Sequence, residues 1–326
     1  MIDQKYTNYN KKINLTIAIP TYNRASLLKE NLNKLLPQLY SVEGVELLII
    51  DNASTDSTFE VCNKASDEGY LTYIKLNKNL GMAFSQYECF SRARGDYIWI
   101  LADDDMIEEN GINIILESIS SKYDIYSFNY KAIDESISSS IGPNESKKFE
   151  HGYQLINLRS VGHMSAFVFR TEVANNKMKE LLKIFPLSYF NSTRGIFGCI
   201  SLSISQTTNL PLYYEAKVLF SSIDQKNLDY NGLMLLCLTA FTHFNIIRKM
   251  NIIGDEIYKY QYDLISMRIL RSYIRWYPTL SFKEMLYVDH LLIPFFSDNF
   301  TKKLVFRIVR IKLVKYFLDK IFKIIL

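Results

Sequence analysis

The sequence predicts an α/β fold in which a mixed, mostly parallel sheet is flanked by helices and followed by a helical C-terminal region. The chain has 326 residues, 48% of them hydrophobic, which is enough to bury a sizeable core. Short apolar segments alternate with helical patterns over the first 120 residues, the order typical of parallel sheets. Beyond about residue 229 the pattern is helical and rich in aromatic residues.

Four strands are expected in the first part of the chain. LTIAI (15–19) and VELLII (45–50) are continuous apolar runs, as in strands buried on both faces, and LTYIKL (71–76) and DYIWIL (96–101) are interpreted as two more. Helices are expected between them at 25–38, 57–68 and 82–94, and after them at 109–121. The second helix is predicted to begin with the capping box Ser57-x-x-Glu60, and the third to end at Gly95.

The second part of the chain has a less regular pattern. Strands are expected in DIYSFNYKAI, from Asp124, and in SAFVFR, from Ser165. A helix is expected over 173–185 and a polar surface loop over 136–146. Boundaries near residues 120 and 228 divide the chain into segments 1–120, 121–228 and 229–326.

The net charge of +4 is unevenly distributed along the chain. Residues 301–326 carry +7, which leaves −3 on the other 300 residues and argues against a uniformly basic nucleic-acid-binding protein. This C-terminal tail is expected to form two short amphipathic segments that contact an anionic membrane surface, or alternatively to pack on the rest of the protein. Its charged residues are Lys302, Lys303, Arg307, Arg310, Lys312, Lys315, Asp319, Lys320 and Lys323.

Cysteine usage and hydropathy predict the compartment. The four cysteines are scattered without metal-ligand spacing, and no apolar run reaches the roughly 18 residues of a membrane span. The expected location is therefore the cytoplasm, with peripheral association at the inner face of the cell membrane.

Polar residues follow each of the four predicted strands. In an open parallel sheet, ligands bind beyond the carboxyl ends of the strands, so four such loops at one edge predict a binding site. Each loop taken alone could be only a turn or a helix cap. The candidate binding residues are Pro20, Thr21, Tyr22, Asn23, Arg24, Asp51, Asn52, Asn79, Gly81 and Asp103.

The triplet Asp103-Asp104-Asp105 indicates a divalent cation site. Neighbouring carboxylates repel one another, by about 4 kcal/mol for unit charges 4 Å apart at an effective dielectric of 20. Mg²⁺ or Mn²⁺ would remove this repulsion, and such ions commonly bind through one or two carboxylates plus substrate phosphates. The alternative is a solvated acidic loop before the helix at 109–121. A dinucleotide-binding domain is excluded because PTYNRAS offers no GxGxxG, and no P-loop is present.

The motifs PTYNR, DNASTD, NLG and ARGDYIWILADDD, in this order over residues 15–120, resemble the nucleotide-binding half of family 2 glycosyltransferases with the GT-A fold. The DNASTD segment is similar to that of bacterial surface-polysaccharide transferases, including abequosyltransferase-like O-antigen enzymes. The resemblance implies metal-dependent transfer of a hexosyl or deoxyhexosyl group from a nucleotide-diphosphate sugar to a glycan or lipid-linked acceptor in capsule or O-antigen synthesis. It makes 1–120 the donor half, 121–228 the acceptor half and 229–326 a helical region with the basic tail.

The resemblance also implies roles for single residues in the donor site. Thr21 and Tyr22 would line the nucleoside pocket, and Asp51 would accept a hydrogen bond from the base. Asn79 and Gly81 would shape the edge of the pocket near the ribose.

The carboxylate signature of this family would be formed by Asp103 and Asp104, with Asp104 as the metal ligand. Counted from Gly95, the usual position of the first Asp of Asp-x-Asp holds Ala102. Asp103-x-Asp105 is therefore an alternative pair, and Asp105 stays a candidate metal ligand.

The catalytic base is not identified by the motifs. Inverting members of the family use a carboxylate some 80–100 residues after the metal motif, but no Asp or Glu lies between Leu181 and Tyr214. The candidates outside this interval are His163, Glu172, Glu180, Glu215 and Asp224.

Two other functions stay open. A sugar nucleotidyltransferase would share an α/β nucleotide site but needs a Gly-rich basic loop after the first strand, which is missing. A non-catalytic, membrane-docked scaffold with a transferase fold would need no base.

Overall fold

The computed structural model describes residues 12–134, 137–140, 142–150, 163–184 and 211–223, and eight further positions between 262 and 310. Residues 1–192 and 196–225 form one compact unit, and residues 193–195 and 226–326 form a second. All elements discussed below belong to the first unit. In the described ranges, no helix combines the length and the apolar composition needed to cross a bilayer. Apart from Phe306, Arg307 and Arg310, the C-terminal tail lies outside the described residues.

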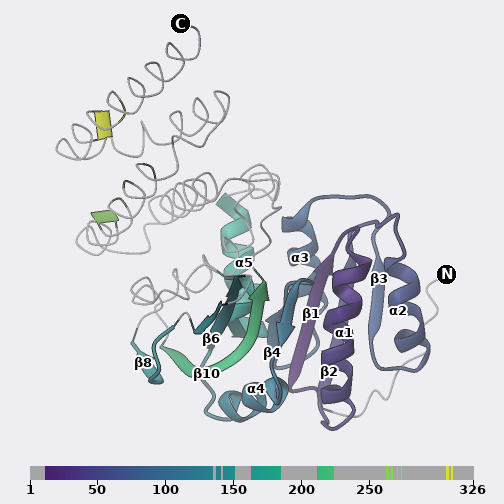
Figure 1. Ribbon diagram of the computed structural model, residues 1–326, viewed down its shortest axis with the longest axis horizontal. Helices are drawn as coiled ribbons and strands as arrows, with labels where there is room; N and C mark the ends of the chain where they lie inside the picture. Colours follow the sequence, from purple (N-terminus) through teal and green to yellow (C-terminus); the bar gives the residue numbers. More distant parts are fainter. Residues whose placement is uncertain are drawn as a thin grey trace, which may run out of the picture. The chain divides into compact units, whose positions relative to one another are not determined.

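Four parallel strands form the N-terminal half of the sheet, as expected. They are β1 (Leu15–Thr21), β2 (Val45–Asp51), β3 (Thr72–Lys75) and β4 (Tyr97–Ile100), in the spatial order β3-β2-β1-β4 (Figure 1). Leu15 pairs with Val45 on one side and with Tyr97 on the other. The chain thus moves outward from β1 to β3 and returns to the other side of β1. The carboxyl ends of β1 and β4 therefore flank a topological switch point, where open α/β sheets bind ligands.

The same sheet continues with strands of mixed direction. Its order runs on through β9 (Phe167–Arg170), β6 (Ile125–Asp134), β10 (Leu212–Ile223) and β5 (Asp105–Ile107), and β8 (Lys147–Phe149) pairs with β10. Only β6 and β10 run parallel among these pairs. One sheet therefore extends through both sides of the boundary placed near residue 120.

One predicted loop contains a strand. Residues Ile137–Ser140 form β7, which pairs antiparallel with the end of β6. The prediction of a surface loop over 136–146 is wrong for these four residues. Their serine-rich composition hid the strand because an outer strand pairs through its backbone and does not require the apolar side chains of a central one.

The predicted helices are confirmed, with small shifts of their ends. They are α1 (Ala25–Leu39), α2 (Thr58–Asp67), α3 (Met82–Arg92), α4 (Gly111–Ile119) and α5 (Thr171–Ile184). Helix α1 packs against α2, and α3 packs against β1, β2 and α5. Leu28, Leu32 and Leu35 form the buried stripe of α1, spaced as expected for one helix face.

The capping box predicted for α2 is wrong. Ser57 precedes the helix but makes no side-chain cap hydrogen bond. The cap is Asp56, whose Oδ1 accepts hydrogen bonds from the backbone N–H and the hydroxyl of Thr58, at 3.1 and 2.6 Å. Burial opposes ionisation of Asp56, but these bonds and one from the backbone N–H of Ala25 outweigh it and lower the pKa of Asp56.

Gly95 permits a close approach between β1 and the segment that leads into β4. A Cβ atom at this position would lie 2.6 Å from the backbone nitrogen of Thr16 and 2.7 Å from the carbonyl carbon of Leu15. Helix α3 already ends at Arg92, so the glycine is required by strand packing and not by the helix end.

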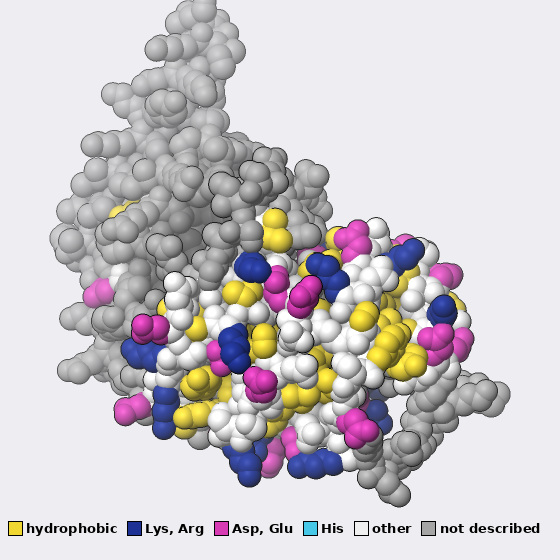
Figure 2. Space-filling model, turned by 60° about the horizontal axis from the view of Figure 1, so that its bottom comes forward, with side chains coloured by type: hydrophobic (Ala, Val, Ile, Leu, Met, Phe, Trp, Pro, Cys, Tyr) yellow, Lys and Arg dark blue, Asp and Glu magenta, His cyan; other side chains and the backbone are white. Residues whose placement is uncertain are grey.

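Charges of both signs are interspersed on the face shown in Figure 2. Among the described residues several of them form ion pairs, such as Lys131 with Glu108 at 2.9 Å and Lys217 with Glu117 at 3.1 Å. The charges in these pairs are therefore balanced by a neighbouring partner.

Candidate functional site

The loops after β1 and β2 are joined by hydrogen bonds at the carboxyl edge of the sheet. Asn23, which has a left-handed backbone (φ 52°), donates its N–H to Ser54 Oγ at 2.8 Å and accepts from the N–H of Thr55 at 2.8 Å. Asp56 Oδ2 accepts from the N–H of Ala25, the first residue of α1, at 3.0 Å. Asp56 therefore caps α1 as well as α2, and it connects the two loops.

The loops after β2 and β3 are joined in the same way. Asn52 donates to Asn79 Oδ1 at 2.9 Å and accepts from the N–H of Leu80 at 3.0 Å. Asn79 Oδ1 also accepts from the N–H of Gly81, at 2.9 Å, where the backbone has a positive φ of 88°. The structure thus brings Asn23, Asn52, Asn79 and Gly81 together at one edge, as expected.

Asp51 lies beneath this edge. Its side chain is fully buried, at 0% exposure, and its Oδ1 accepts from the N–H of Ser54 at 2.8 Å. Its Oδ2 accepts a hydrogen bond from the Tyr73 hydroxyl, and burial together with this bond raises the pKa of Tyr73. A nucleobase could reach the Asp51 carboxylate only if the groups that cover this carboxylate, such as Tyr73, move. Sequence reasoning missed Tyr73, because nothing in the strand pattern marks its hydroxyl.

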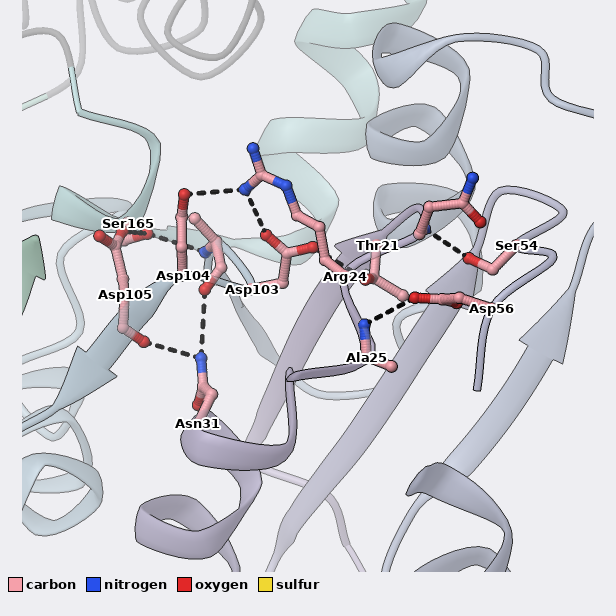
Figure 3. Close-up of polar contacts among 12 residues, drawn as sticks. Thr21, Arg24, Ala25, Asn31, Ser54, Asp56, Asp103, Asp104, Asp105 and Ser165 are labelled. Atoms are coloured by element: carbon pink, nitrogen blue, oxygen red, sulfur yellow. Dashed lines mark hydrogen bonds and ion pairs between the residues drawn. The ribbon is translucent and has the colours of Figure 1, made fainter. Parts of the chain in front are cut away.

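Two of the three adjacent carboxylates converge on one cationic nitrogen. Arg24 Nη1 lies 3.0 Å from Asp103 Oδ1 and 2.8 Å from Asp104 Oδ2, and Thr21 donates to Asp103 Oδ2 at 2.8 Å (Figure 3). These contacts cross the switch point between β1 and β4. Tyr22, next to Thr21, is 39% exposed at the same edge.

The electrostatics of the Asp103 and Asp104 carboxylates favour a bound cation between them. Burial raises the pKa of Asp103 to about 6, although the positive charge of Arg24 acts in the opposite direction. Burial disfavours the charged form of Arg24 too, but the two carboxylates outweigh it and raise its pKa. Ionised Asp103 therefore depends on a positive partner.

The donor set fits a divalent cation that is completed by a ligand. The position of Arg24 Nη1 shows that Asp103 and Asp104 can direct one oxygen each to a single cation. Among the described residues there is no group of three or more His, Cys, Asp or Glu side chains that could hold a metal. Mg²⁺ or Mn²⁺ would bind here through two carboxylates, with phosphate oxygens and water in the other positions.

Asp105 does not join this pair. It is 1% exposed, and its Oδ2 accepts from the Ser165 hydroxyl at 2.5 Å, on the side away from Arg24 (Figure 3). Burial raises the pKa of Asp105, with His163 acting in the opposite direction. The geometry thus pairs Asp103 with Asp104, and the alternative pair Asp103-x-Asp105 does not converge on the guanidinium.

The loop that carries the carboxylates is held from two sides. Asn31, on α1, donates to the carbonyl oxygens of Ala102 and Asp105 at 3.2 and 2.7 Å. Ser165, in the 3₁₀ turn η2 (Met164–Ala166), accepts from the N–H of Ala102 at 2.9 Å. Sequence reasoning missed both residues. A polar residue within the buried stripe of α1 was the one available signal for Asn31.

His163 is the described base candidate that lies beside the triplet. Its Nδ1 lies 3.4 Å from Asp105 Oδ2 without forming a hydrogen bond, and its Nε2 is 3.1 Å from Ser222 Oγ. Its ring contacts Tyr130 and Phe220, with centroids 5.0 and 5.1 Å away.

The other base candidates lie elsewhere. Glu172 is exposed in the first turn of α5, and Glu180 forms an ion pair with Lys177 at 2.7 Å. Glu215 accepts from the Ser146 hydroxyl at 2.9 Å. Asp224 lies outside the described residues.

Comparison with known proteins supports the resemblance noted in the motifs. The glycosyl transferase family 2 model matches residues 16–176. Abequosyltransferase RfbV of Salmonella typhimurium is 34% identical over 114 residues, which is 34% of this chain and 34% of that protein. Glycosyltransferase GlyG of Streptococcus pneumoniae is 29% identical over 124 residues, 37% of this chain and 40% of that protein. The matched region thus spans only about a third to two fifths of these curated relatives.

Solved structures share the fold at low sequence identity. S. aureus TarS 1-349 in complex with UDP has a TM-score of 0.66 at 15% identity, covering 94% of this chain and 89% of that chain. Mannosyltransferase PcManGT from Pyrobaculum calidifontis, in complex with GDP-Man and Mn²⁺, has a TM-score of 0.52 at 14% identity, covering 94% and 88%. Residues 16–176 of this chain thus match glycosyl transferase family 2, and the mixed sheet has the GT-A fold.

Proposed function

We propose that this chain transfers a sugar from a nucleotide-diphosphate donor to a glycan hydroxyl and that a divalent cation, Mg²⁺ or Mn²⁺, binds the donor diphosphate. The observation that supports this is the convergence of Asp103 and Asp104 on one cation position, 3.0 and 2.8 Å from Arg24 Nη1, at the switch point of the sheet. The family match of residues 16–176 and the nucleotide-bound structural neighbours agree with it.

The residues around the proposed diphosphate position hold the carboxylates in place and orient them toward the cation. When bound, the cation supplies Lewis-acid stabilisation of the departing diphosphate. Thr21 fixes the Asp103 carboxylate through its hydrogen bond, while Asn31 and Ser165 fix the loop behind it. Asp104 has a side chain that is 23% exposed and is accessible to a ligand.

We place the nucleoside over the loops after β1 to β3. Tyr22 offers an exposed ring there, and Asn79 and Gly81 form the rim beside it. Asp51 would contact the base only after Tyr73 releases it.

The base that accepts the proton of the acceptor hydroxyl is assigned to His163 in this proposal. It lies beside Asp105 and borders the acceptor half through Ser222. Asp224, two residues after Ser222 in the chain, is the alternative, and Glu172 is disfavoured by its exposed place on α5.

A nucleotide screen tests the donor site. UDP, GDP, CDP and dTDP are each added to the full chain with and without Mn²⁺, and the melting temperature is measured. One diphosphate is expected to raise the melting temperature, and to raise it more strongly with Mn²⁺. The reason is that a ligand that binds only the folded state stabilises the folded state. Hydrolysis of the matching sugar nucleotide should then be detectable. Binding without turnover would favour the scaffold, and pyrophosphate release from a nucleoside triphosphate and a sugar phosphate would favour the nucleotidyltransferase.

We further propose a lipid-linked acceptor in bacterial surface-polysaccharide synthesis, reached by peripheral association at the inner face of the cell membrane. The support is the charge of +7 on residues 301–326 and the likeness to an abequosyltransferase.

The full chain is expected to sediment with anionic vesicles at low salt and to be released as salt is raised, because screening acts over about 8 Å at physiological ionic strength. Replacing Lys312, Lys315 and Lys323 by serine should weaken this binding and leave donor hydrolysis unchanged. Failure to bind anionic vesicles at low salt would contradict this part of the proposal.

A further inference from the structure

Arg24 is placed where the proposed cation would bind. A single nitrogen of its guanidinium, Nη1, contacts one oxygen of Asp103 and one of Asp104, at 3.0 and 2.8 Å. The guanidinium therefore takes the place of a positive ion between the two carboxylates (Figure 3). Two cations cannot share this position, and their mutual repulsion would act at short range in a partly buried environment.

The side chain of Arg24 can move while its backbone stays in place. Its carbonyl oxygen accepts from the N–H of Leu28 at 3.0 Å, and the next residue, Ala25, is held by Asp56. The side chain is 33% exposed and is therefore not enclosed by the fold. A planar guanidinium also binds phosphate oxygens through two parallel hydrogen bonds, which gives it an alternative partner when a diphosphate is present.

We infer that Arg24 is an exchangeable internal cation. It neutralises Asp103 and Asp104 when neither metal nor donor is bound. It gives up this position to a divalent cation and then turns to the phosphate oxygens of the donor. The inference rests on the proposed donor site. Its consequence is that the metal and the diphosphate bind cooperatively. Without a diphosphate the metal must displace Arg24 into water, whereas with one the displaced guanidinium gains a new partner. By linkage, each of the two ligands strengthens binding of the other.

The decisive variant is Arg24→Gln in the full chain. Mn²⁺ binding without nucleotide, measured by calorimetry and by the EPR signal of free Mn²⁺, is expected to become about ten-fold tighter, because the competing charged hydrogen bonds are lost. The affinity for UDP or GDP in the presence of Mn²⁺ is expected to fall about ten-fold, because the phosphate ligand is lost. Opposite changes in these two affinities are not expected from an arginine that serves only the fold.

Two further variants control the result. Arg92→Gln removes the same charge from an ion pair with Glu88 on α3 and should change neither affinity. Asp104→Asn should abolish Mn²⁺ binding in the wild-type and in the Arg24→Gln background. Circular dichroism checks that each variant is folded. If Arg24→Gln does not fold, Arg24→Lys, which keeps the charge but not the planar fork, should still loosen the coupling between Mn²⁺ and the diphosphate.

The outcomes separate the inference from the proposed function. If Asp104→Asn abolishes Mn²⁺ binding but Arg24→Gln binds Mn²⁺ no more tightly than the wild type, the exchange is overturned and the metal site stands. If Mn²⁺ binding is insensitive to Asp104→Asn, the metal site is overturned, and the exchange with it.

Discussion

Replacing Asp104 by alanine is expected to lower donor turnover by about 10²–10³-fold while leaving the protein folded, the size of effect seen when one preorganised charge-stabilising group is removed. Asp104 is the more exposed member of the carboxylate pair, and it forms an ion pair with Arg24, which keeps Asp103 as a partner in the variant. The change also removes a like charge next to Asp103. Initial rates of sugar-nucleotide hydrolysis, together with melting temperatures, measure both parts of the expectation.

Two controls accompany the Asp104 variant. Asp67→Ala removes an exposed carboxylate at the end of α2, where Asn63 contacts it, and should leave turnover unchanged. Excess chelator should reduce the wild type to the rate of Asp104→Ala and have little further effect on the variant. Full wild-type activity in excess chelator would refute the metal dependence.

Replacing the next residue, Asp105, by alanine is expected to act first on stability. The Ser165 hydroxyl, which donates to Asp105 in the core, would lose its acceptor, and a small cavity would remain. We expect the free energy of unfolding to fall by about 2–3 kcal/mol, the usual cost of a buried unsatisfied polar group plus lost packing. Urea unfolding measures this loss.

Asp105→Asn separates the shape of this side chain from its charge. Burial raises the pKa of Asp105, so its ionised form is costly in the folded state. The asparagine keeps an acceptor for Ser165 without that charge and should therefore be less destabilising than alanine. If Asp105→Ala were as stable as the wild type but lost Mn²⁺ binding, Asp105 would be a metal ligand and our pairing of Asp103 with Asp104 would be wrong.

The parallel half of the fold could be predicted because its physical requirements are local. Strands covered on both faces need continuous apolar runs, and LTIAI and VELLII provide them. Once four strands run in the same direction, their carboxyl ends lie at one edge, so the clustering of Asn23, Asn52 and Asn79 follows from the direction of the strands.

The orientation of the three carboxylates could not be predicted from the sequence. Asp103, Asp104 and Asp105 are chemically identical neighbours, and their difference arises because Asp105 is the first residue of β5 and pairs with Ser222 on β10. That pairing joins segments far apart in the chain. The contacts of Asn31 and Ser165 with the same loop likewise depend on tertiary packing, which no local pattern encodes.

The two-sided support of residues 102–105 bears on protein engineering. Asn31 comes from the N-terminal half of the sheet and Ser165 from the segment beyond residue 120, yet both bind Ala102 and Asp105. A chimera joined near residue 120, with its second half taken from a relative of different acceptor preference, would keep Asn31 but inherit a foreign residue opposite Asp105. Recombination at this point should therefore carry Ser165, or another hydroxyl in its place, along with the N-terminal half. Exchanging the second half would otherwise also disturb the loop that carries Asp103 and Asp104.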